Sequence, residues 1–337
     1  MNTVSLPRAT ATPPLLGAVG IGDIRWNRPL LVLGAAMAAL AVVAVVGLVV
    51  DPREVTGLPV WAKPLKFALS TGIYAVTLAW LVGQVVRFRR VAAVAGVVTA
   101  VALGIELAII TGFAVVAETS HFNMTTPLHT VAWTIMGSSI GVLWVATFVV
   151  AAVSFVTPLG DRARSLAVRA GAVIAVIGMG LAFLMTGPTD AQLADYQGIA
   201  GAHTVGLPDG GPGLPILGWS TVGGDLRVPH FVGMHALQAL PILLLVLELA
   251  ARRVPRLADA ALRFRLVVIA AVAYLAVVGL TTWQALAGQS IVAPSGAVLV
   301  TGLGLAAATV VAVVVAIRSR TPVPQPARAA RGVSSRA

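Results

Sequence analysis

The sequence predicts an all-α membrane protein with eight transmembrane helices, and three observations lead to this fold class. Of its 337 residues, 58% are hydrophobic and only 10% are charged, which is too little charge to cover a soluble domain of this length. The apolar residues gather in long runs, and about 20 apolar residues are enough to cross a bilayer as a helix. The Lys and Arg residues lie almost entirely in the short connections between these runs.

Eight apolar stretches are each long enough to cross the hydrocarbon core, because a helix rises about 1.5 Å per residue. We expect membrane helices at 29–50, 65–86, 91–117, 128–155, 165–187, 230–250, 263–285 and 295–317. The first run is too long for the apolar part of a cleavable signal peptide, so we interpret it as the first membrane helix. Residues 1–28 form an N-terminal segment, and the Pro-, Arg- and Ser-rich tail at 318–337 is expected to be disordered.

The basic residues predict the orientation of the helices. Nineteen of the 23 Lys and Arg residues fall in one alternating set of connections, and the exceptions are Arg53, Lys63, Lys66 and Arg227. Because cytoplasmic loops carry the excess of Lys and Arg, both termini are predicted to be cytoplasmic, in the plasma membrane. The net charge of +11 therefore reflects topology, and no nucleic-acid partner is expected. The chain has no cysteine, which excludes disulfides and thiolate metal sites.

The extracytoplasmic connections are unequal, and the longest is 188–228. Its second half is rich in Gly and Pro, and loops of this length are usually functional or disordered. Trp219 and its apolar neighbours Leu214, Ile216 and Leu217 would let it pack down as a lid. A short helix is predicted near 189–196, with Thr189 or Asp190 as its N-cap.

All five histidines are predicted to lie in the extracytoplasmic half of the protein: His121, His129, His203, His230 and His235. Polar groups deep in a membrane helix are costly unless they face the bundle interior. Glu106 and Gln238 are predicted at such depths, so we expect them to share one buried pocket with His129 and His235. Ordinary histidines at helix ends, with their ring N–H groups satisfied, are the alternative. Because residues 230 and 235 are five apart, a regular helix would keep their side chains from chelating one ion together.

The segment WAKPLKF (61–67) contains both lysines of the chain. Lys63 and Lys66 lie at the predicted outer mouth of the second helix, where they could bind an anion, a lipid phosphate or a haem propionate. The positive end of the helix dipole lies at the same place. Equally, Trp61 and the lysines could serve only as interfacial anchors.

Two further outer segments, 118–129 and 223–230, are dense in hydrogen-bonding groups. We expect Asp225 and Arg227 to pair with the lysines and with Glu118 across the outer mouth. The predicted pocket or ligand-binding residues are Lys63, Lys66, Glu106, Glu118, His121, Asn123, His129, Asp225, Arg227, His230, His235 and Gln238. Neither an HExxH motif nor a Walker or dinucleotide-binding motif is present.

The segments WAKPLKFALSTGIY (61–74), SHFNMTTPLH (120–129) and AHTVGLPDGGPGLPILGWSTVGGDLRVPHFVGMHALQ (202–238) resemble a family of uncharacterised polytopic bacterial membrane proteins of actinobacterial type. The resemblance covers roughly residues 60–245. It implies a multi-pass membrane protein, and it implies no activity, cofactor or catalytic residue.

Three functions fit these patterns, and none of them defines catalytic residues. The first is a membrane redox protein in which His129 and His235 bind haem or a divalent metal. The second is a proton-coupled transporter whose substrate path is lined by Glu106, the buried histidines and Gln238. Against it, the sequence indicates no break in a membrane helix and almost no polar lining in the inner half. The third is a lipid-binding or lipid-modifying protein with a small molecule, lipid or anion at the outer mouth.

Overall fold

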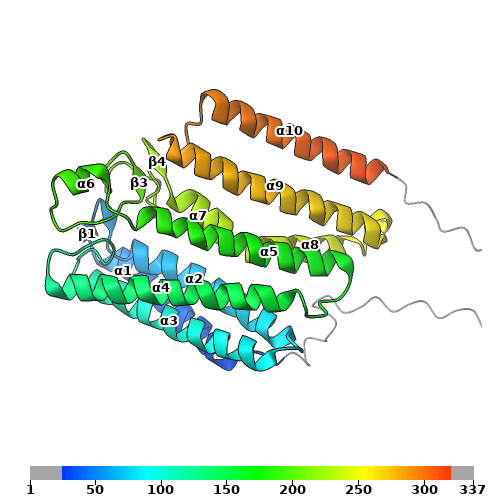
Figure 1. Cartoon of the computed structure of the whole chain (residues 1–337), viewed down its shortest axis with the longest axis horizontal. Coiled ribbons are helices and arrows are strands. Elements are labelled where there is room, and N and C mark those ends of the chain that lie inside the picture. Colours follow the sequence, from blue (N-terminus) through cyan, green and yellow to red (C-terminus); the bar gives the residue numbers. More distant parts are fainter. Residues whose placement is uncertain (1–24, 320–337) are drawn as a thin grey trace, which may run out of the picture.

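The computed structural model describes residues 25–319, which form a bundle of long helices along one axis (Figure 1). Seven of the described helices are long and apolar enough to cross a membrane, as expected of a multi-pass membrane protein. The seven candidates correspond to α1 (Arg28–Val50), α2 (Ala62–Gln84), α3 (Arg89–Val115), α4 (Pro127–Ser154), α5 (Arg162–Gly180) with the segment that follows it, α9 (Ala260–Leu286) and α10 (Gly296–Arg318). Together, α7 (Arg227–Met234) and α8 (Ala236–Ala250) form an eighth, bent candidate.

The described chain begins and ends at the same end of the bundle (Figure 1). The opposite end carries two small antiparallel hairpins, β1 (Glu54–Val55) with β2 (Leu58–Pro59) and β3 (Thr204–Val205) with β4 (Gly224–Asp225). It also carries α6 (Asp190–Ala194). We call it the hairpin end; it is the end predicted to be extracytoplasmic. Apart from residues 25–28 and 318–319, the predicted terminal segments lie outside the described residues.

Local side-chain caps explain where several helices begin. The Thr126 hydroxyl accepts a hydrogen bond from the backbone N–H of His129, and Pro127 occupies the first position of α4, where its missing N–H has no cost. Asp161 caps α5 in the same way through the N–H of Arg164. The predicted short helix near 189–196 is confirmed as α6, and Thr189 closes a capping box at its start.

Two glycines of α5 allow it to pack closely against the α7–α8 pair. A Cβ on Gly178 would lie 2.3 Å from the backbone carbon of Gly233, and one on Gly171 would lie 2.7 Å from the carbonyl oxygen of Ala236. Gly137 and Gly141 of α4 have the spacing typical of close helix contacts, but a Cβ at either would meet no described atom of another element within 4 Å.

The predicted continuous helix at 230–250 is broken at His235, where α7 and α8 meet at 46°. The N–H of Gln238 donates to the carbonyl of His235, an i to i+3 bond that tightens the turn. Pro241 inside α8 also removes one helical hydrogen bond and weakens the helix nearby. The break occurs at His235, between Gly233 and Pro241, inside a run that is otherwise mostly apolar.

Candidate functional site

A buried polar cluster lies at the hairpin end and is built around Glu106 of α3. Only 2% of Glu106 is exposed, and its Oε1 lies 3.7 Å from Nε2 of His121 in the α3–α4 connection. Its Oε2 is buried and has no hydrogen-bond partner among residues 25–319. Lys63, in the first turn of α2, interacts electrostatically with this carboxyl group. The structure therefore places His121, rather than the expected His129, beside Glu106.

His203 and Asp209 add a second acid–base pair to the cluster. His203 Nδ1 lies 2.6 Å from Asp209 Oδ2, and the backbone N–H groups of His203 and Thr204 also donate to this carboxylate. The ring of His203 packs on Phe122, with centroids 4.8 Å apart. Sequence reasoning did not place Asp209 in the pocket, because its position six residues after His203 in an irregular loop carries no periodic signal.

The electrostatics of these loop residues favour uncharged imidazoles. Burial lowers the pKa of His121 well below 6.5, and nearby Lys63 and His203 lower it further. Burial also lowers the pKa of His203, although Asp209 opposes this effect. Burial alone would raise the pKa of Asp209, but its hydrogen bonds from His203 and Thr204 outweigh that and hold the pKa low. The cluster thus contains neutral imidazoles beside carboxyl groups, an arrangement suited to proton transfer.

The 206–226 segment contacts the hairpin end of the helices through Lys66, Trp219 and Arg227, whereas Ile216, which was expected to pack, is exposed. The Lys66 ammonium donates to the Leu217 carbonyl over 2.7 Å, and the Trp219 ring contacts Phe231 of α7. Arg227 also donates to the carbonyl of Gly218.

Asp225 and Arg227 pair with each other rather than across the outer mouth as expected. Arg227 Nε donates to Asp225 Oδ1 over 2.9 Å, and buried Asp225 also accepts from the Ser220 N–H. Asp225 and Arg227 are only two residues apart, so they can pair within one turn of the chain. A pair with Glu118 or a lysine would require two separate segments to meet. A cavity of about 200 Å³ lies beside Arg227 and is lined otherwise by loop residues, including Thr204, Leu207 and Ser220.

Two of the predicted pocket residues are used locally. His129 Nε2 lies 2.9 Å from Glu118 Oε2, and its Nδ1 lies 2.7 Å from the Thr126 hydroxyl. Asn123 accepts hydrogen bonds from the N–H and hydroxyl of Thr125. These contacts fix the turn that leads into α4.

The break between α7 and α8 forms a second polar site, deeper in the bundle. His235 Nε2 lies 3.0 Å from the Ser70 hydroxyl of α2, and its Nδ1 lies 3.3 Å from Gln238 Oε1. Gln238 Nε2 is buried and has no partner in the described part of the chain. His230 Nδ1 donates to the Gly178 carbonyl over 2.8 Å, which links α7 to α5.

Buried polar contacts continue toward the other end of the bundle, contrary to the expectation of an almost apolar inner half. Between α2 and α4, the hydroxyl groups of Tyr74 and Thr147 lie 2.6 Å apart. Arg164 Nε of α5 lies 2.7 Å from Glu248 Oε1 of α8, and each side chain is only 6% exposed. Sequence reasoning missed this pair because Arg164 was assigned to a cytoplasmic connection, whereas α5 already begins at Arg162.

The geometry gives no support to the predicted metal or haem site. Across residues 25–319, no group of three or more His, Asp or Glu side chains could hold a metal ion. Both ring nitrogens of His129 and of His235 already have polar neighbours. No family model, curated protein or solved structure matches the chain, so the resemblance described above stays a prediction.

Proposed function

We propose that this protein is a proton-coupled transporter of the plasma membrane, with both termini cytoplasmic and an anionic substrate entering from the hairpin end. The observation that carries the proposal is the candidate membrane span formed by α7 and α8, which bends by 46° at His235. In transporters, discontinuous helices commonly form the substrate site near the middle of the bilayer. Here α7 contributes eight residues, or about 12 Å of rise, before the break. With the predicted orientation, we expect the break to lie well below the outer surface.

Polar groups on both sides of the break support a path through the bundle. The Glu106 cluster lies toward the hairpin end, the Ser70–His235–Gln238 contacts lie at the break, and the Arg164–Glu248 pair lies toward the other end. Buried ionisable groups in membrane helices commonly mark ion and substrate pathways. The sequence indicated neither a break in a helix nor polar groups toward the end where the chain begins. The structure has both a bend at His235 and the Arg164–Glu248 pair, which supports the proposal.

Glu106 is the residue that we expect to exchange the coupled proton. One of its oxygens faces neutral His121, and the other is buried without a hydrogen-bond partner among the described residues. A carboxyl group placed in this way is stable when protonated, while nearby Lys63 stabilises the carboxylate. An anion bound at Lys63 would weaken the stabilisation of the Glu106 carboxylate and so favour its protonation. Substrate flux and proton flux would be coupled in this way. Because Lys63 and Arg227 bring an amino group and a guanidinium group to this end of the bundle, we expect the substrate to be a small anion.

A flux experiment tests this proposal. The full-length protein is reconstituted into liposomes that contain a pH-sensitive dye, and phosphate, monocarboxylates and dicarboxylates are added in turn. We expect one class of anion to change the internal pH, and we expect Glu106→Gln to abolish that change. Glu54→Gln is the matched control, because Glu54 is exposed on the β1–β2 hairpin at the same end. Absence of flux with every anion, or full flux in Glu106→Gln, would refute the proposal.

A further inference from the structure

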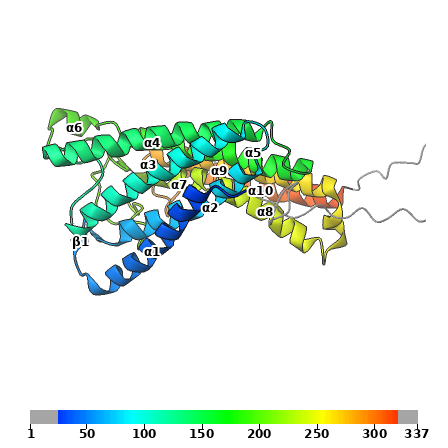
Figure 2. The same ribbon diagram turned by 90° about the horizontal axis from the view of Figure 1, so that it is seen from below.

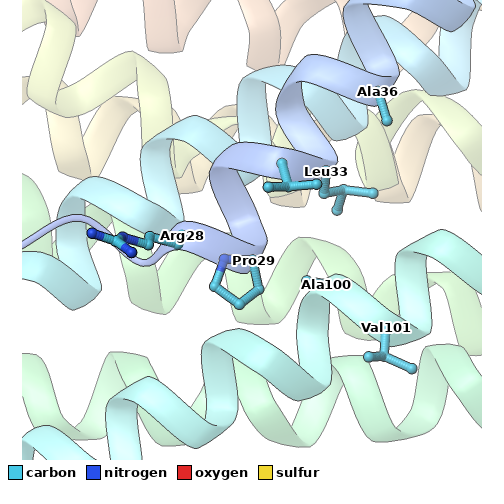
Figure 3. A pocket seen from close by; sticks show the side chains of 7 residues that line it. Arg28, Pro29, Leu33, Ala36, Ala100 and Val101 are labelled. Atoms are coloured by element: carbon cyan, nitrogen blue, oxygen red, sulfur yellow. The ribbon is translucent and has the colours of Figure 1, made fainter.

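An apolar groove opens on the outside of the bundle between α1 and α3, and none of its lining residues belongs to the polar sites described above. Its volume is about 480 Å³, and its lining is Arg28, Pro29, Val32, Leu33 and Ala36 of α1 with Ala100 and Val101 of α3. Figure 3 shows Arg28 at one end of this row of apolar side chains. The helix α1 lies at the edge of the bundle (Figure 2), so the groove faces the surrounding lipid.

Close packing at the start of α1 sets one end of the groove. The Asn27 side-chain amide donates to the Ala93 carbonyl over 3.3 Å, and a Cβ on Gly96 would lie 2.7 Å from that amide nitrogen. Leu30 is completely buried beside this contact. About one to two turns farther along α1, Val32 and Ala36 are exposed instead, as is Val101 on α3. The two helices therefore touch at the end where they begin and leave an apolar gap farther along.

Positive charge surrounds the same end of the groove. Both α1 and α3 begin there, and the exposed basic side chains at their first residues are Arg25, Arg28, Arg89 and Arg90. Arg28 also belongs to the groove lining. Guanidinium groups bind phosphate through paired, charge-assisted hydrogen bonds. A phosphate at the rim and an alkyl chain along Pro29, Leu33 and Val101 would satisfy both chemistries at once.

We propose that this groove is a binding site for one anionic phospholipid from the leaflet at that end of the bundle. Its acyl chain lies between α1 and α3, and its phosphate group contacts Arg28. Basic pockets next to membrane helices commonly recognise anionic head groups. The site does not depend on transport activity, since it shares no residue with the Glu106 cluster or with the break at His235.

Native mass spectrometry of the full chain in detergent tests the proposal, with phosphatidylglycerol and phosphatidylcholine of equal chain length as probes. We expect one phosphatidylglycerol to remain bound under conditions that remove phosphatidylcholine. A basic residue near an anionic lipid contributes about fivefold in affinity, so Arg28→Gln should weaken phosphatidylglycerol binding about fivefold. Arg318→Gln is the matched control for charge. Arg318 is exposed at the last residue of α10, which lies at the same end of the bundle as Arg28.

A second pair of variants tests the groove itself. Ala36→Phe places a ring among the lining residues and should remove the bound lipid. Ala39→Phe adds the same ring to an exposed position of α1 outside the lining and should leave binding unchanged. Equal binding of the two lipids, equal effects of Arg28→Gln and Arg318→Gln, or a second protein copy in place of lipid would each overturn the assignment.

Discussion

Replacement of Gly178 by alanine should loosen the contact that holds α7 against α5. The added Cβ would lie 2.3–2.4 Å from three backbone atoms, the carbonyl carbon and Cα of Gly233 and the nitrogen of Met234. Carbon atoms pack favourably at about 3.5–4.0 Å, so the two backbones must separate by roughly 1 Å or more. Such overpacking typically costs about 1–3 kcal/mol, and it exceeds the gain of about 1 kcal/mol expected for alanine over glycine in a helix.

Gly180→Ala is the matched control, because a Cβ there would come no closer than 3.5 Å to any described neighbour, the Trp144 ring nitrogen. We therefore expect Gly180→Ala to be neutral or slightly stabilising and Gly178→Ala to be about 2 kcal/mol less stable than the control. Reversible unfolding in mixed micelles, followed by tryptophan fluorescence, measures the difference. If the two variants unfold at the same denaturant concentration, the close approach of α5 and α7 does not limit stability, and the reasoning fails.

Two further predictions concern charge. Because burial lowers the pKa of His121 and His203 below 6.5, the unfolded chain takes up more protons as the pH falls through 6.5. The Tm should therefore drop between about pH 7 and pH 5, and His121→Gln should flatten this dependence; an unchanged slope would argue against buried neutral imidazoles. Asp209, whose pKa is held low, should add a further loss only below about pH 4. At the other end of the bundle, Glu248→Leu should cost about 3–5 kcal/mol, and Arg164→Met in the same chain should restore most of it; simple additivity of the two losses would contradict a coupled ion pair.

Much of the helical framework could be predicted from local sequence. The predicted spans agree with the described helices to within a few residues at most ends, because long apolar runs require intrahelical hydrogen bonds in lipid. The cap at Thr126 and the short helix after Thr189 were also predictable, because capping depends on residues within one turn. The position of the break between α7 and α8 was not predicted, and the close approach of Gly233 to Gly178 beside it joins two different helices.

In the candidate site, too, some features were predictable from local sequence and others depended on contacts between distant segments. Sequence reasoning included Glu106, His121 and Lys63 among the predicted pocket residues, but it grouped Glu106 with His129, His235 and Gln238 rather than with His121. It predicted His129 as the partner of Glu106, but the contact belongs to His121 in the preceding loop. It also passed over Ser70 and Asp209, whose partners are 165 and six residues away.

What the sequence alone determined is the class of protein: apolar runs of membrane-spanning length and alternating basic connections are properties of successive residues and of the solvent around them. The tertiary structure decided which polar groups meet, where the sixth span breaks, and that a buried pair joins Arg164 to Glu248. The physical reason is distance along the chain. Hydropathy and capping act within a few residues, whereas a buried charge or amide finds its partner on another helix, and that choice depends on how closely the backbones can pack.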